Sequence, residues 1–216
     1  MSHDYVHVEA LASNRPRSQE LAEAFERGDT LVLVLADGAG GIRGGEVASR
    51  KVVDAVRDAV DRPEFALHDV RAWAELLRAT DADLAATRSG ETTGLVIALG
   101  PAGLVGASAG DSEAWVVTPS QVDDLTSAQH TRRRLGTGRA IPATFERSAL
   151  AGVLLVATDG LFKQASRDVI VRLVRAHAMG RAVEELVGLV RLPSGQLPDD
   201  VGIVLATRKA PLPAPQ

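Results

Sequence analysis

The chain has 216 residues, 45% of them hydrophobic and only 3% aromatic, so a single domain with an aliphatic core is the expected organisation. It has no cysteine, which excludes disulfides, zinc–thiolate sites and cysteine nucleophiles. The net charge of −4 argues against a nucleic-acid partner. No signal peptide or membrane-length apolar run is evident, so we expect a cytoplasmic protein with no membrane partner.

The first half of the chain is expected to contain one buried strand followed by two helices. Residues 1–29 are polar and are expected to be irregular, apart from a candidate strand at 5–10. The unbroken apolar run 31–36 predicts a strand that is buried on both faces. Apolar side chains then recur at helical spacing over about 45–61 and 68–88, and Pro63 ends the first of these helices.

The second half is expected to contain consecutive strands and then a helix pair. The expected strands are 93–99, 104–109, 114–118, 145–150, 153–157 and 201–207, and the expected helices are 166–178 and 181–190. Gly110 to Glu113 is expected to be a hairpin turn. Short turns imply antiparallel pairing, and helix pairs suit the outer faces of sheets. The prediction is a layered α+β fold with a β-sandwich core over 1–208, followed by a Pro-rich, frayed tail at 209–216.

Four aspartates stand at predicted strand ends or turns, each beside a glycine or a second acid. They are Asp37, Asp111, Asp159 and Asp199. Any one of them is more often a turn residue than a ligand. Because the ends of stacked strands can converge, the four together predict a metal site, since a cation removes the repulsion between close carboxylates. Histidines are few, so oxygen ligands and therefore Mg²⁺ or Mn²⁺ are expected, as two ions in a hydrolytic site.

Five segments around these aspartates carry a recognisable series of motifs. They are Ala-Asp-Gly-Ala-Gly-Gly at 36–41 with Gly-Glu-Val-Ala-Ser at 45–49, Thr-Thr at 92–93, Ala-Gly-Asp-Ser-Glu-Ala at 109–114, Leu-Leu-Val-Ala-Thr-Asp-Gly-Leu-Phe at 154–162, and Pro-Asp-Asp-Val-Gly-Ile-Val at 198–204. In order and approximate spacing they resemble the motifs of the metal-dependent protein phosphatases of type 2C (the PPM family), in their short bacterial form. The resemblance covers nearly the whole chain.

The resemblance implies an αββα four-layer sandwich, with two antiparallel sheets flanked by helix pairs. It also implies a protein serine/threonine phosphatase in which a metal-bridging hydroxide attacks phosphorus. By position, Asp37 bridges two ions, the Gly38 carbonyl binds one of them, Asp159 and Asp199 complete the pair, and Asp111 belongs to a third, more weakly held ion. The implied substrate is a phosphorylated protein, and we expect it to belong to a Ser/Thr kinase signalling pathway.

The chain departs from the family pattern in its N-terminal motif. Residues 15–20 are the nearest match, so Arg15 is expected to bind phosphate and take part in catalysis, and Glu20 to stand for an aspartate at the metals. Gln19 replaces an acid there, and at most orients a metal-bound water. Arg17 is a rival for the phosphate-binding role, and a solvated polar loop is the plainer alternative for the whole stretch.

The chain also departs from the family pattern in two further places. One is the position implied to bind a third ion, and the other is a segment implied to face the substrate. Lys163 stands where the family often has an aspartate, so it would weaken a third ion or replace its charge; Asp200 replaces an asparagine. Residues 129–138 correspond to a reduced substrate-facing flap. Its arginines at 132–134 either attract an acidic or phosphorylated partner or are simply solvated, and His130 is either a general acid or a surface histidine.

These departures leave alternatives to an active protein phosphatase. One is a catalytically weak or inactive type-2C-like protein that acts as a partner-binding regulatory module, since a fold does not guarantee activity. Another is hydrolysis of a small phosphate ester, or of the phosphoserine of an anti-sigma antagonist in a stress-signalling module. If the protein is an active phosphatase, we expect hydrolysis of a phosphopeptide or p-nitrophenyl phosphate that requires Mn²⁺ and disappears with Asp37→Asn or Asp159→Asn.

Overall fold

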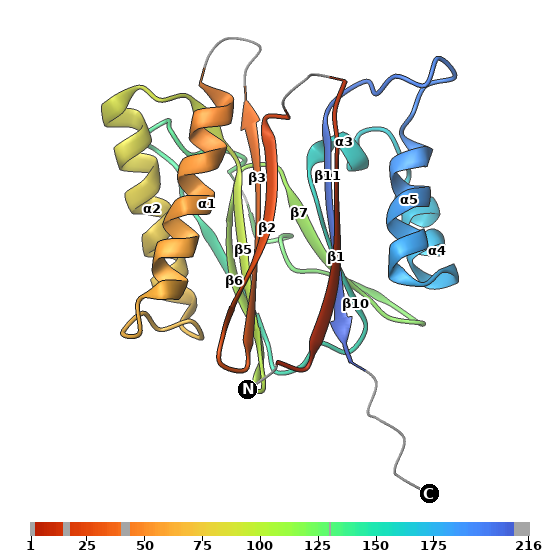
Figure 1. Ribbon diagram of the computed structural model, residues 1–216, viewed down its shortest axis with the longest axis horizontal. Coiled ribbons are helices and arrows are strands. Elements are labelled where there is room, and N and C mark those ends of the chain that lie inside the picture. Colours follow the sequence, from red (N-terminus) through yellow and green to blue (C-terminus); the bar gives the residue numbers. More distant parts are fainter. Residues whose placement is uncertain (1–2, 15–17, 40–43, 130, 210–216) are drawn as a thin grey trace, which may run out of the picture.

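The computed structural model describes residues 3–14, 18–39, 44–129 and 131–209, which form four stacked layers (Figure 1). Helices α1 (Gly45–Asp61) and α2 (Val70–Thr87) cover the outer face of one sheet. Helices α4 (Arg167–Ala176) and α5 (Met179–Leu189) cover the outer face of the other. The expected αββα sandwich is confirmed. The boundary at 208 stays a prediction, and the tail at 210–216 lies outside the described residues.

Both sheets are antiparallel throughout. The first has the order β2 (Glu20–Arg27), β3 (Thr30–Ala39), β5 (Gly94–Gly100), β6 (Gly103–Ala109) and β9 (Ala143–Arg147), and β4 (Glu91–Thr92) pairs with the end of β3. The second has the order β1 (Tyr5–Ala12), β11 (Val201–Arg208), β10 (Val153–Ala157), β7 (Glu113–Val117) and β8 (Val122–Asp124). A short helix, α3 (Asp159–Phe162), follows β10. No described helix is both long enough and apolar enough to cross a bilayer.

Strand β3 is buried on both faces, as its apolar run predicts. Val32, Val34 and Ala36 pack in the cluster beneath α1 and α2, whereas Leu31, Leu33 and Leu35 pack in the cluster between the two sheets. Alternate side chains of a strand point to opposite faces, so this one strand contributes to two cores. Its position in the middle layers makes its C-terminal end a rigid support for the residues that follow.

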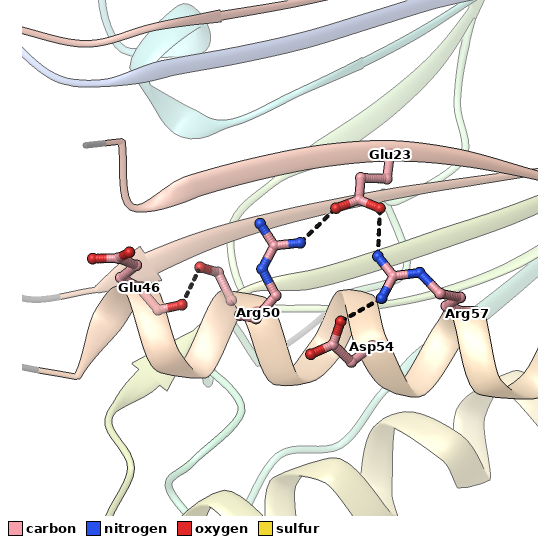
Figure 2. A network of polar contacts seen from close by, with 6 residues as sticks. Glu23, Glu46, Arg50, Asp54 and Arg57 are labelled. Carbon is pink, nitrogen blue, oxygen red and sulfur yellow. Dashed lines mark hydrogen bonds and ion pairs between the residues drawn. The ribbon is translucent and has the colours of Figure 1, made fainter. Parts of the chain in front are cut away.

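Strand β2 was not expected, because residues 1–29 were predicted to be irregular apart from the first strand. One of its glutamates, Glu23, is balanced by α1: it accepts from Arg50 Nη1 at 2.6 Å and from Arg57 Nη2 at 2.7 Å (Figure 2). The Arg57 guanidinium also lies 5.3 Å from the centre of the Phe25 ring. Charges that look solvated in the sequence are therefore the contacts that join this edge strand to a helix, and tertiary packing overrides local propensity.

The expected hairpin turn at Gly110 is wrong, because β6 and β7 lie in different sheets. The chain crosses from one sheet to the other at this point. Gly110 has φ 107°, and a Cβ there would lie 2.6 Å from Thr93 Cγ2, so the crossing requires glycine. The crossing places Asp111 between the sheets, at the edge of the sandwich.

The helices match their expected spans closely, whereas several strand ends differ. α1 covers the expected 45–61, and α2 begins after Asp69, whose carboxylate accepts from the Arg71 N–H at 2.8 Å as an N-cap. Strand β9 ends at Arg147 rather than 150, and β8 was not expected. Asp37 lies inside β3 rather than at its end, and Asp159 begins α3.

Candidate metal centre

Three aspartates from separate parts of the chain converge at one edge of the sandwich. Asp37 of β3, Asp111 of the sheet crossing and Asp159 of α3 each offer a carboxylate oxygen, and these oxygens all lie within 4.8 Å of one another. In Figure 1 the end of β3 and helix α3 lie at the same upper end of the molecule. Close carboxylates repel, and a divalent cation between them would neutralise that repulsion.

The Asp37 carboxyl lies in an environment that disfavours its charged form. Burial and then the charge of Asp159 raise the pKa of Asp37 to about 6, and Asp111 and Asp199 add to the rise. The nearby Arg134 guanidinium acts in the opposite direction. Among the described residues, no cation lies within ion-pair distance of Asp37. A metal ion would supply the positive charge that this carboxylate lacks.

Glu20 is a buried acid directly beside Asp37. It lies opposite Asp37 in the β2–β3 register, and only 1% of its surface is exposed. Burial and then the charge of Asp37 raise the pKa of Glu20 to about 9, so without metal this carboxyl is protonated at neutral pH. Its Oε1 accepts from Thr158 Oγ1 at 3.0 Å. Glu20 therefore lies next to the aspartate cluster, on the strand that was not expected, and its role beside a metal stays a prediction.

Three buried side-chain atoms in the described part of the chain have no hydrogen-bond partner, and all three lie at this centre. They are Glu20 Oε2, Asp111 Oδ1 and Arg134 Nε. An unsatisfied buried polar group costs about 1–3 kcal/mol, so such groups are rare without a function. The two oxygens would bind a cation, that of Glu20 once its carboxyl is deprotonated, and the nitrogen would donate to an anion. An all-oxygen donor set with two open acceptors fits Mg²⁺ or Mn²⁺.

Two side-chain cations already contact the aspartate cluster. Lys163 Nζ lies 2.5 Å from Asp159 Oδ2, and Arg134 Nη2 lies 3.5 Å from Asp111 Oδ2. The hydrogen bond to Asp159 raises the pKa of Lys163, so the lysine stays charged. Its side chain is 57% exposed, which leaves it room to withdraw. A metal ion at Asp159 would compete with Lys163 for the same oxygen.

Buried hydroxyl groups hold the aspartates in place, and sequence reasoning gave them no role. Thr93 Oγ1 accepts from the Asp37 N–H at 3.0 Å and lies 2.8 Å from Ser112 Oγ, next to Asp111. The Thr93 N–H in turn donates to the Asp37 carbonyl at 2.8 Å. Thr158 Oγ1 accepts from the Gly202 N–H at 3.0 Å, which joins β10 to β11 beside Asp159. The available signals were Thr158, directly before Asp159, and the paired threonines at 92–93.

Gly38 is required by its close approach to the start of α1. A Cβ at Gly38 would lie 2.3 Å from the Gly45 carbonyl oxygen, a separation that no side chain tolerates. The Gly38 N–H donates to the Gln19 carbonyl at 3.1 Å, which ties β3 to the chain before β2. The structure thus gives the glycine a packing role, and metal binding by its carbonyl stays a prediction.

Two predicted site residues remain, Asp199 and Arg15. Asp199 lies outside the trio and accepts from the Asp200 N–H at 2.9 Å, although its charge contributes to the raised pKa values of Asp37 and Glu20. Arg15, the predicted phosphate ligand, lies outside the described residues, as do Arg17 and His130.

The loop that carries Arg134 is anchored by a buried acid that sequence reasoning missed. Asp81 of α2 is 4% exposed and accepts from the N–H groups of Gly136 at 2.7 Å, Gly138 at 2.9 Å and Ala140 at 2.9 Å. Leu135 is fully buried and exchanges two backbone hydrogen bonds with Thr92, at 3.0 and 2.8 Å. An aspartate on the apolar face of a helix was the signal, because such a residue needs buried partners.

Comparisons with known proteins establish the fold. No protein-family model matches the sequence, and no curated protein matches it. The serine/threonine phosphatase Stp1 of Staphylococcus aureus is 21% identical with a TM-score of 0.80, over 96% of this chain and 96% of that one. PstP/Ppp of Mycobacterium tuberculosis is 23% identical with a TM-score of 0.77, over 95% and 98%. The catalytic domain of PstP, solved with two manganese ions, is 24% identical with a TM-score of 0.73, over 95% and 98%. This is the fold that the motif resemblance implies.

Proposed function

We propose that the protein is a divalent-metal-dependent protein serine/threonine phosphatase. The observation that carries the proposal is the convergence of Asp37, Asp111 and Asp159 within 4.8 Å, together with the open acceptors of Glu20 and Asp111. These acids lie in the fold of bacterial serine/threonine phosphatases. Hydrolysis of a phosphate monoester requires that negative charge be neutralised at the reacting phosphorus, and a cation-filled acidic centre supplies that neutralisation.

In this proposal Asp37 and Asp159 hold two Mn²⁺ or Mg²⁺ ions, assisted by the Gly38 carbonyl and Asp199. When bound, such ions neutralise the phosphoryl oxygens and lower the pKa of a water molecule. The manganese complex of PstP supports a count of two for this fold. Lys163 already neutralises part of the charge of Asp159, so a third ion near that oxygen would have to compete with it.

The protein's own groups prepare the centre for the ions. Thr93 and Thr158 fix the backbone around Asp37 and Asp159 through buried hydrogen bonds, so that little ordering is left for the binding step. Glu20 holds a proton while the centre is empty, since its pKa is about 9, and it would release that proton when positive charge arrives beside it. Metal binding is therefore expected to release protons into solution.

The substrate side of the proposal rests on charge and position. Arg15 is proposed to bind the phosphoryl group, in keeping with the motif resemblance. A cavity of about 260 Å³ opens beside Asp111 and is lined by polar groups that include Glu113 and Arg132. It offers room for residues that flank a phosphoserine or phosphothreonine. A phosphorylated protein of a kinase pathway, acting in the cytoplasm, is the proposed physiological substrate.

A turnover assay on a generic phosphopeptide tests the proposal. Metal-stripped protein should be inactive and regain activity with Mn²⁺, and Asp37→Asn or Asp159→Asn should reduce the rate at least about 100-fold, because each removes a charged metal ligand. Asp83→Asn is a matched control, since Asp83 lies on the exposed face of α2. Turnover without metal contradicts the mechanism. A folded, Mn²⁺-loaded wild type without turnover favours the partner-binding alternative.

A further inference from the structure

Arg134 lies beside the acidic cluster at the start of an anchored loop segment. The loop that follows it is fixed: Leu135 is buried and paired with Thr92, and Asp81 accepts three backbone N–H groups just beyond it. The Thr137 hydroxyl also donates to the Arg134 carbonyl at 2.9 Å. Arg134 is therefore positioned by the backbone, unlike Arg132 and Arg133, whose side chains are exposed.

The guanidinium of Arg134 is poorly satisfied by the protein itself. Its contact to Asp111 Oδ2, at 3.5 Å, is at the outer limit of a hydrogen bond. Its Nε is buried without an acceptor, and the other oxygen of the same aspartate, Oδ1, is buried without a donor. These two contacting side chains thus hold one buried donor and one buried acceptor, each without a partner among the described residues. A cation on Asp111 and an anion on Arg134 would satisfy both.

We propose that Arg134 is a substrate-binding residue that donates through Nε and Nη2 to the phosphoryl oxygens. A guanidinium forms a planar fork that matches two oxygens of a phosphate, which a point charge such as Lys163 cannot do. Arg134 lies on the loop after β8, whereas Arg15 lies near the N-terminus, so the two arginines are far apart in the sequence. The inference rests on the proposed phosphatase function, and assigns a second phosphate-binding guanidinium to it.

The competing explanation is that Arg134 only balances the charge of Asp111. The two explanations predict different effects of removing the guanidinium. A phosphate ligand affects the binding of phosphate to the metal-loaded protein. A counter-charge affects the binding of the metal, because its loss leaves Asp111 more negative and so strengthens the attraction for a divalent ion.

The test measures inorganic phosphate binding to the Mn²⁺-loaded protein by phosphorus NMR, in which bound manganese broadens the phosphate signal. Calorimetry measures Mn²⁺ affinity in parallel, and circular dichroism checks that each variant is folded. Arg134→Gln removes the charge, and Arg134→Lys keeps the charge but loses the fork. Arg133→Gln is the matched control, because it removes the same charge from an adjacent, exposed position of the same loop.

We expect Arg134→Gln to weaken phosphate binding about 10- to 100-fold, the range for hydrogen bonds to a charged group. Arg134→Lys should recover only part of that loss, and Arg133→Gln should bind phosphate like the wild type. Unchanged phosphate affinity in Arg134→Gln, or a Mn²⁺-loaded wild type that binds no phosphate, overturns the inference. A wild type that binds phosphate but hydrolyses no phosphopeptide contradicts the proposed function, and the role of Arg134 is still decided by the phosphate titration.

Discussion

The two Asp-Gly pairs of the centre, at residues 37–38 and 159–160, have the same sequence but different electrostatic surroundings. Asp159 begins a short helix, so Lys163, four residues later, lies on the same face, and its Nζ pairs with Asp159 Oδ2 at 2.5 Å. Asp37 lies in a strand, where neighbouring side chains alternate between faces, and within the described residues it has no such cation. One aspartate therefore carries its own counter-charge, and the other depends on charge from outside the protein.

Because Asp37 has no paired cation among the described residues and Asp159 has Lys163, we expect Asp37 to contribute more to metal affinity than Asp159. Asp37→Asn should lower Mn²⁺ affinity at least about 100-fold, because the ion loses a ligand whose charge no side chain offsets. Asp159→Asn should lower it less, since the wild-type ion must first displace Lys163 from that oxygen. Calorimetric titration of both variants measures the difference. Equal losses, or a larger loss at Asp159, would show that the lysine does not compete with the metal.

The free energy of unfolding should also depend on pH, because Asp37 and Glu20 are partly or fully buried acids without a paired cation in the described part of the chain. The pKa of Glu20 is about 9 and that of Asp37 about 6 in the folded protein, both above the ordinary values of 4.5 and 3.8. Without metal, the folded state then binds more protons than the unfolded state between those limits. The free energy of unfolding therefore falls as pH rises from about 5 to about 9.

Glu20→Gln should remove most of the pH dependence of the free energy of unfolding. Urea unfolding in a chelator should show the wild type losing on the order of a few kcal/mol between pH 5 and pH 8, and the variant losing much less. Glu64→Gln, at an exposed position, is the control and should follow the wild type. A wild type that is equally stable at both pH values would mean that Glu20 is not a buried, uncompensated acid.

A smaller effect is expected from the lysine itself. Lys163→Met should raise Mn²⁺ affinity about 2- to 5-fold at neutral pH, because a partly exposed ion pair contributes little and its removal frees one oxygen of Asp159. Lys51→Met removes a comparable surface pair with Asp83 and should leave the affinity unchanged. Weaker Mn²⁺ binding in Lys163→Met would indicate that the lysine organises the centre rather than competing with the ion.

Those features that depend on local patterns were predictable from the sequence. The apolar run gives β3, the helical spacing gives α1 over its whole length, and the repeated aspartate motifs correctly place Asp37, Asp111 and Asp159 together. The resemblance supplied the layer order, which the structure confirms.

Features that depend on partners distant in sequence were not predictable. Strand β2 reads as a polar loop because the arginines that balance Glu23 come from α1 (Figure 2). The turn at Gly110 resembles a hairpin, since no local signal says that the next strand joins the other sheet. The run of arginines at 132–134 gives no indication that Arg134 is the one that contacts the aspartate cluster, because that depends on the anchoring of its loop by Asp81.

Calorimetric titration of metal-stripped protein with Mn²⁺, repeated in buffers of different ionisation enthalpy, measures both the number of ions bound and the protons released. We expect two ions bound per chain, with release of protons from Glu20 and Asp37 near neutral pH, because both pKa values are raised while the centre is empty. Absence of Mn²⁺ binding, or binding without proton release that persists in Asp37→Asn, would contradict this expectation.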